Sequence, residues 1–434
     1  MTDWRALIAE HLATHPMVPP PEKDGYWWPL ARPSLTANDI AAALDILLSG
    51  NTTCWKAVGL FEGAFADRFA PARAAVMVNS GSSANLLAAE LLARRIGRGA
   101  EVVIPAVTWP THAWAAIQAG LRVRFSDVDV HRWTATAESV DAAATAATRA
   151  VWLVHPLGLV ADVVPLRALA AHRGWTVMED CCDALGAMHG SLPVGARSLA
   201  ATFSLFYSHA LTTMEGGVVV VDREDAPALR AWRSHGWTRD LPRWAGGALL
   251  RGAPPGPFVF GDLGWNLRPT EVQGAIGLSQ LAHWTSTEAR RRALGAWWER
   301  IVATVAKAVP EIGLGMPTLT AGDALHGLPF QTPVAERICR ALEAAGVETR
   351  PILAGDMTTQ PAVRALREDG RASWPNSDRA DLMYGARSVH MDARYLGLLP
   401  TATDAERDRL AETFLTACRG ARHESAFSKE VGDA

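Results

Sequence analysis

Short apolar runs alternate with amphipathic stretches between about residues 72 and 222 of this 434-residue chain. The runs with the length and composition of β-strands are Ala75–Val78, Glu101–Pro105, Arg122–Asp127, Ala150–Val154, Thr176–Glu179, Thr202–Phe206 and Val218–Val221. Helical spacing of apolar positions occurs between them, in Ala84–Arg95, Thr111–Ala119 and Pro165–His172. Near-continuous apolar strands that alternate with helices predict an α/β domain, with a mostly parallel seven-stranded sheet between layers of helices.

The remaining segments predict further parts, because 434 residues exceed what one hydrophobic core normally supports. We expect an N-terminal helical segment (1–48, interrupted by the extended residues 16–22), a large domain (49–290), a smaller C-terminal α+β domain (291–420) and a tail (421–434). A long helix at about 286–308 would connect the two domains. The Gly/Pro-rich stretch 242–262 is either a cover over a site or a long connection.

Composition narrows the class of protein. Apolar residues make up 49% of the chain and charged residues 20%, which is typical of a folded protein, and the net charge of −3 gives no reason to expect nucleic acid or a membrane surface as partner. The N-terminus lacks the pattern of a signal peptide, and no run of about 18 apolar residues occurs. Five cysteines form neither a disulfide framework nor a CxxC pair. We therefore expect a cytoplasmic protein without a metal site.

Three turns at the ends of predicted strands carry candidate chemistry. The motif Asn79-Ser-Gly-Ser-Ser-Ala-Asn85 opens a helix, whose free N–H groups and dipole favour a phosphate, although an ordinary capped helix would look the same. Asp180 ends an apolar strand, where it either pairs with a cofactor ring nitrogen or caps a turn. Trp109 either stacks on a flat ring or belongs to the core.

A fourth candidate is His209, which precedes the turn Thr212-Thr-Met-Glu-Gly-Gly217. A lone histidine in a loop is more often structural than catalytic. Its position relative to Asp180 and to the double glycine favours a catalytic role, since an imidazole can transfer protons near neutral pH.

Together these motifs resemble the DegT/DnrJ/EryC1/StrS sugar aminotransferases, a family of fold-type I proteins that use pyridoxal 5′-phosphate (PLP). The resemblance extends from about residue 35 to 400 and rests on the 79–85 motif, Glu179-Asp180 and the Ser204…His209…Glu215-Gly-Gly block. The segments Thr202–His209, His235–Arg239 and Gly264–Pro269 resemble more narrowly the GDP-4-keto-6-deoxymannose 3-dehydratase branch of deoxysugar and lipopolysaccharide biosynthesis.

The lysines of the chain give this resemblance its specific meaning. Only four occur, Lys23, Lys56, Lys307 and Lys429, so the large domain lacks the lysine that normally holds PLP covalently. His209 stands where that lysine would fall. A histidine cannot bind the cofactor covalently but can still move a proton, which implies elimination with pyridoxamine 5′-phosphate (PMP) as a free amine.

The resemblance also implies a role for each site residue. Gly81, Ser82 and Ser204 would bind the cofactor phosphate, Trp109 would stack on the ring, Asp180 would pair with the ring nitrogen, and Asp183 would lie in the same site. His209 would be the catalytic base with Ser208 beside it, and Arg239 and Arg350 would hold substrate anions. Asn266 would reach the phosphate of a neighbouring subunit, which implies a homodimer.

The reaction so implied removes the C3 hydroxyl of a nucleotide-linked 4-keto-6-deoxy sugar. His209 would take a proton from the cofactor's C4′ carbon, with the ring protonated by Asp180 as the electron sink. L-Glutamate would then restore PMP. One departure from the branch is Ala210, because relatives often carry a second histidine directly after the base.

Two alternative functions stay open at this stage. A nucleotide-sugar aminotransferase would need the missing lysine, and a catalytically inactive sensor or scaffold would not need its intact cofactor residues. A second histidine-containing branch carries an iron–sulfur cluster, which needs four convergent thiolates. The cysteines here are too few and too scattered for that cluster: Cys54, Cys181, Cys182, Cys339 and Cys418. We therefore expect no iron–sulfur cluster.

Overall fold

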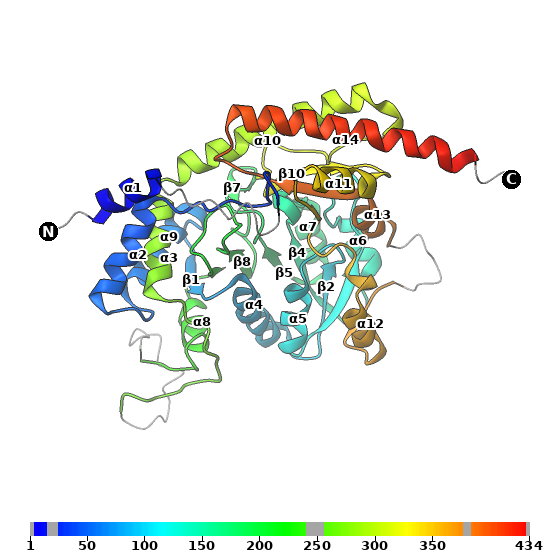
Figure 1. The fold of residues 1–434 in the computed structure, drawn as a ribbon. Helices are drawn as coiled ribbons and strands as arrows, with labels where there is room; N and C mark the ends of the chain where they lie inside the picture. The colour runs from blue at the N-terminus through cyan, green and yellow to red at the C-terminus, as the bar shows by residue number, and fades with distance from the viewer. Residues whose placement is uncertain (1–3, 15–24, 240–255, 376–382, 431–434) are drawn as a thin grey trace.

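The computed structural model of the chain, which describes residues 4–14, 25–239, 256–375 and 383–430, is built around one large sheet (Figure 1). In spatial order its strands are β1 (Ala74–Val78), β9 (Gly217–Val221), β8 (Ala200–Ser204), β5 (Thr176–Asp180), β4 (Thr148–Val154), β2 (Glu101–Pro105), β3 (Arg122–Ser126) and β12 (Ala372–Ser373). Only β9 runs antiparallel to its neighbours among these strands. The predicted α/β fold with a mostly parallel sheet is therefore confirmed, and β12 adds an eighth strand.

The apolar composition of the strands follows from burial on both faces of the sheet. Val76 and Val78 on β1 belong to a core with the helices α4 (Gly81–Ile96) and α5 (Pro110–Gln118), whereas Met77 between them packs into a separate apolar cluster. Alternate residues of a strand point to opposite faces, so a strand covered on both sides needs apolar residues at every position.

Three helices gather at one end of this sheet, at the left of Figure 1. They are α2 (Ala37–Ser49), α3 (Lys56–Phe69) and α9 (Glu271–Ala282). The buried carboxylate of Glu271 accepts hydrogen bonds from the backbone N–H groups of Trp55, Ala57 and Val58. Because these groups begin α3 and have no partners within the helix, the contact stabilises the start of α3 and joins it to α9.

A second core contains buried side chains of the long helix α10 (Trp284–Ala308), which the sequence predicted at about 286–308. It includes a three-stranded sheet in the order β10 (Gly327–Gln331), β13 (Ala393–Gly397) and β11 (Thr349–Pro351), together with α11 (Ala335–Ala344) and α14 (Asp404–Glu430). Trp28 from the N-terminal part is buried in this core and donates a hydrogen bond from Nε1 to the Gly397 oxygen. The domain boundaries given above stay a prediction.

The other α-helices and strands of the described residues complete the two parts. They are α1 (Trp4–Thr14), α6 (Ala137–Ala143), α7 (Val163–Arg173), β6 (Met188–His189), β7 (Leu192–Pro193), α8 (Ala226–Trp232), α12 (Pro361–Glu368) and α13 (Tyr384–Asp392). The expected extended segment 16–22 and most of the 242–262 stretch lie outside the described residues. Among the described helices, none combines the length and hydrophobicity that crossing a bilayer requires.

Candidate active site

A cleft of about 440 Å³ opens where the carboxyl ends of β4, β5 and β8 meet the beginning of α4. The second core closes it from the other side through His326, Arg350 and Tyr395. The predicted site residues that line it are Gly81, Ser82, Trp109, Asp180, Asp183, Ser204, Ser208, His209 and Arg350. Ligands of parallel α/β sheets bind at this edge, so the fold brings these distant motifs together.

The beginning of α4 forms a cradle for an anion. Ser80 caps the helix by accepting a hydrogen bond from the Ser83 N–H at 3.1 Å, and helix geometry leaves the N–H groups of Gly81 and Ser82 without partners in the helix. A Cβ atom on Gly81 would lie only 2.8 Å from the Ser204 Cβ. Glycine is therefore required for the approach of α4 to β8, and the cradle fits a phosphate group.

The Asp180 carboxylate is held in place from two sides at the end of β5. Asn85 donates a hydrogen bond from Nδ2 to Asp180 Oδ2 at 2.9 Å, and the Cys182 N–H donates to Oδ1 at 3.0 Å. Both Asn85 and Asp180 are buried. A carboxylate fixed in this way at the floor of the cleft fits a protonated ring nitrogen as its partner.

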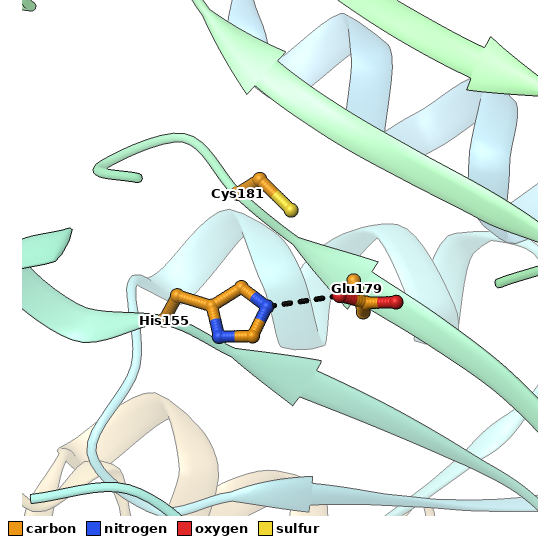
Figure 2. A group of neighbouring side chains, drawn as sticks. All are labelled: His155, Glu179 and Cys181. Atoms are coloured by element: carbon orange, nitrogen blue, oxygen red, sulfur yellow. Dashed lines mark hydrogen bonds and ion pairs between the residues drawn. The ribbon is translucent and has the colours of Figure 1, made fainter. Parts of the chain in front are cut away.

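A buried network behind Asp180 anchors the same strand end (Figure 2). His155 Nδ1 accepts a hydrogen bond from the Ala161 N–H, so Nε2 carries the proton and donates to Glu179 Oε2 at 3.1 Å. The Gly195 N–H donates to the same oxygen at 2.8 Å. Burial would raise the pKa of Glu179, but these donors outweigh it and lower that pKa. With both ring nitrogens engaged, His155, Glu179 and the neighbouring Cys181 form a structural network.

His209 lies opposite Asp183 in the cleft, and its side chain is 15% exposed. The distance from His209 Nδ1 to Asp183 Oδ1 is 3.9 Å, which is too long for a direct hydrogen bond. Burial and the neighbouring His326 lower the pKa of His209 to about 4, although the Asp183 carboxylate acts against them. Burial likewise raises the pKa of Asp183. His209 is therefore a neutral imidazole at neutral pH, ready to accept a proton.

The positions of the lysines and of Trp109 decide whether a lysine could hold the cofactor covalently and whether a tryptophan could stack on its ring. Lys56 and Lys307, whose side chains the structure describes, are exposed on α3 and α10 and do not line the cleft. Trp109 is 53% exposed at the cleft, so the interpretation of this residue as a core tryptophan is wrong. Its indole is available to a flat ring.

Two predicted residues lie apart from the cleft lining of their own chain. Asn266 pairs with Ser234 in an isolated β-bridge, and the Arg239 guanidinium stacks on Trp237 with its carbon 3.9 Å from the ring centroid. Their roles toward a neighbouring subunit or a substrate stay predictions.

Sequence reasoning missed several side chains that the cleft contains, among them Asn85, His326 and Tyr395. Asn85 belongs to the 79–85 motif, but nothing in the motif indicated its bond to Asp180. His326 and Tyr395 come from the segment before β10 and from β13, and their imidazole and phenol rings lie 6.5 Å apart. No local pattern marks either of these two residues, because only the packing of the second core against the sheet brings them to His209.

Known proteins match both the sequence and this geometry. The family model of the DegT/DnrJ/EryC1/StrS aminotransferases matches residues 33–392. A GDP-4-keto-6-deoxy-D-mannose 3-dehydratase of Escherichia coli O55:H7 is 32% identical over 341 residues, which cover 76% of this chain and 86% of the relative. The structure of the E. coli enzyme with bound hydrated PLP has a TM-score of 0.79 and 29% identity, over 90% of this chain and 99% of that one. A structure with a trapped PLP-glutamate geminal diamine has a TM-score of 0.78 and 29% identity, over 89% and 100%. The chain therefore belongs to the DegT/DnrJ/EryC1/StrS aminotransferase family.

Proposed function

We propose that this protein is a PMP-dependent 3-dehydratase that removes the C3 hydroxyl of a nucleotide-linked 4-keto-6-deoxy sugar. The observation that carries the proposal is the neutral, largely buried imidazole of His209 in a cleft whose lining contains no lysine among the described residues. An aminotransferase of this family would hold its cofactor covalently on a lysine. The sequence and structural similarity to GDP-4-keto-6-deoxy-D-mannose 3-dehydratases supports the same class of reaction.

The residues present fit the cofactor that this proposal needs. The cradle at α4 suits its phosphate, Asp180 suits its ring nitrogen and Trp109 suits its ring face. When bound, PMP supplies an amine for the sugar ketone and a protonated ring that stabilises negative charge.

The chain itself would supply the proton transfer. The Nδ1 side of His209 faces Asp183, which leaves Nε2 as the atom that accepts a proton from the reacting carbon. The imidazolium so formed lies opposite the Asp183 carboxylate, and it can return the proton to the departing hydroxyl. Asp180, held by Asn85, would keep the ring nitrogen protonated throughout. L-Glutamate would act as the amino donor that restores PMP.

We further propose that the enzyme is a homodimer. Asn266 lies outside the cleft of its own chain, near the exposed side chain of Leu263. A neighbouring subunit would bring Asn266 to the phosphate cradle and cover this apolar surface. Sedimentation of the protein with and without PLP tests the association, and a monomer that binds PLP with full affinity would contradict it.

The reaction is tested with the full-length protein, PLP, L-glutamate and a panel of GDP-, CDP- and dTDP-linked 4-keto-6-deoxy sugars. Glutamate should convert the absorbance of bound PLP into that of PMP, and one sugar of the panel should yield its 3-deoxy-4-keto product with release of ammonia. A 4-amino sugar as the product would instead identify an aminotransferase. If neither the glutamate half-reaction nor a reaction of any sugar is observed, the sensor alternative is favoured.

Two substitutions at position 209 test the role of the imidazole. His209→Asn removes the base, so we expect dehydration to fall by at least about 10²-fold, the usual contribution of a positioned general base. His209→Lys restores an amine, so borohydride should trap PLP on the chain in this variant and not in the wild type. A His209→Asn enzyme with full dehydratase activity would remove the mechanistic basis of the proposal.

A further inference from the structure

His326 is a polar side chain beside the proposed base that the proposed reaction does not use. Its imidazole centroid lies 4.8 Å from that of His209, and the two rings are inclined by 48°. One ligand atom from each of Asp183, His209 and His326 lies within 4.8 Å of the others. The sequence gives no reason for this arrangement, since His326 comes from the segment that precedes β10.

The Nδ1 atom of His209, which faces Asp183, needs a hydrogen-bond partner. Within the part of the chain that the structure describes, His209 Nδ1 is buried and has no hydrogen-bond partner. Asp183 Oδ1 lies 3.9 Å away. One water molecule can bridge a polar contact of this length, and a buried polar atom left without any partner costs about 1–3 kcal/mol.

A metal ion would fit this triangle less well than water. The ligand atoms of a tetrahedral zinc site lie about 2.0–2.2 Å from the ion, which places them roughly 3.4 Å from one another. The 3.9 Å separation of His209 from Asp183 exceeds that value, whereas two hydrogen bonds through a water span it easily.

We propose that His326 is a positioning residue that, together with Asp183 and through one shared water, keeps the proton of neutral His209 on Nδ1 and so presents Nε2 as the base. This inference rests on the proposed function and adds a residue to it. A second imidazole thus lies beside the base, although the position directly after the base is Ala210. His326 acts on His209, so it contributes to every proton transfer that His209 makes.

The electrostatic surroundings agree with this role. The charged and titratable groups around the pair are Asp183 and Asp180 from the large domain, Arg291 from α10 and Tyr395 from β13. Burial and the Arg291 guanidinium lower the pKa of His326 to about 3. His326 is therefore neutral at neutral pH. One of its ring nitrogens can donate a hydrogen bond and the other can accept one, so His326 can bind the water in either way.

Substitutions at position 326 should leave the fold in place, because the backbone carries its structural contacts. The His326 N–H donates to the Leu157 oxygen at 2.9 Å, and the Arg291 guanidinium donates to the His326 oxygen at 3.3 Å. The test therefore compares His326→Phe, which cannot bind the water, with His326→Gln, which can. His172→Gln, at an exposed histidine of α7, is the matched control.

The first readout consists of two rates. One is that of the glutamate half-reaction of the PLP-loaded enzyme, which is monitored by absorbance, and the other is that of sugar dehydration. We expect His326→Phe to lower the rate constants of both reactions by a similar factor of about 3–10 with the KM for glutamate unchanged, because only the fraction of His209 that carries its proton on Nδ1 can act as the base, and His326→Gln to recover part of the loss. Wild-type rates in His326→Phe would overturn the inference. Loss of dehydration alone would also overturn it, because His326 would then act on the sugar.

The second readout does not depend on activity. Nitrogen NMR of the full-length protein with labelled histidine reports which ring nitrogen of His209 carries the proton, with His209→Asn identifying the signal. We expect the Nδ1–H form in the wild type and in His326→Gln, and a mixture of both forms in His326→Phe. Identical spectra in wild type and His326→Phe would contradict the inference. If the wild type reacts with glutamate but dehydrates no sugar, the proposed function fails, while the glutamate half-reaction and the NMR spectra still decide the role of His326.

Discussion

Asn85 is the side chain that fixes the orientation of the Asp180 carboxylate. Its Nδ2 donates to Asp180 Oδ2 at 2.9 Å, and both residues are buried. Asn85→Leu removes this donor and leaves a buried carboxylate oxygen with one hydrogen bond fewer, which costs about 1–3 kcal/mol. We expect the variant to lose stability by that amount and to bind PLP more weakly, as measured by chemical denaturation and by absorbance titration.

An asparagine outside the cleft lining provides the control for this substitution. Asn51 is exposed, so Asn51→Leu should change neither stability nor PLP affinity beyond about 0.5 kcal/mol. Asn85→Asp should weaken PLP binding as well, because a second carboxylate next to Asp180 favours a shared proton over the charged form that the ring nitrogen needs. PLP affinity equal to that of the wild type in Asn85→Leu would show that Asp180 is positioned without Asn85.

At the scale of elements, the contact between α4 and β8 determines whether the anion cradle forms. A Cβ atom at position 81 would lie 2.8 Å from the Ser204 Cβ, closer than two such atoms approach in proteins. Gly81→Ala should therefore push the beginning of α4 away from β8. We expect a loss of about 1–3 kcal/mol in stability from overpacking. The displaced N–H groups should also weaken PLP binding and reduce competition by inorganic phosphate.

A second helical glycine separates this steric effect from the effect of glycine on helix propensity. Gly59 on α3 has open space around the position of a Cβ atom, so Gly59→Ala should be neutral or stabilising by up to about 1 kcal/mol. The double variant Gly81→Ala, Ser204→Gly removes the atom that the new methyl group would strike. It should regain part of the stability lost in the single variant, since glycine within a strand itself costs about 0.5–1 kcal/mol. If it regains none, the clash is not the cause.

The strands of the large sheet and the residues at their ends show what the sequence could predict. The strands were predictable because most of them are near-continuous apolar runs, and the cleft residues at their ends were predictable because parallel strands end at one edge of a sheet. β12 was not predicted, since only Ala372 and Ser373 pair with β3. His326 could not be placed from the sequence either. Its proximity to His209 depends on how the second core packs against the large sheet, and no local pattern carries that information.

For the molecule as a whole, the cleft between the two cores buries ionisable groups whose titration contributes to stability. Burial lowers the pKa of His209 to about 4, as it does for His112 beneath the cleft, and the pKa of His326 falls to about 3. An unfolded chain restores each of them to about 6.5. Between about pH 4 and 6.5 the unfolded state therefore binds more protons than the folded state, so stability falls as the pH is lowered through this range.

This linkage predicts how many protons the protein takes up when it unfolds. Each of the three histidines contributes up to one proton near pH 5.5, which corresponds to about 1.4 kcal/mol per pH unit and per group. Calorimetry of the cofactor-free protein in buffers of different ionisation enthalpy measures this uptake directly. We expect His326→Phe to reduce it by about one proton and His172→Gln to serve as the reference for an exposed histidine. If His326→Phe takes up as many protons as the wild type, His326 titrates in the folded protein as it does in water. Its burial between the two cores would then not hold in solution.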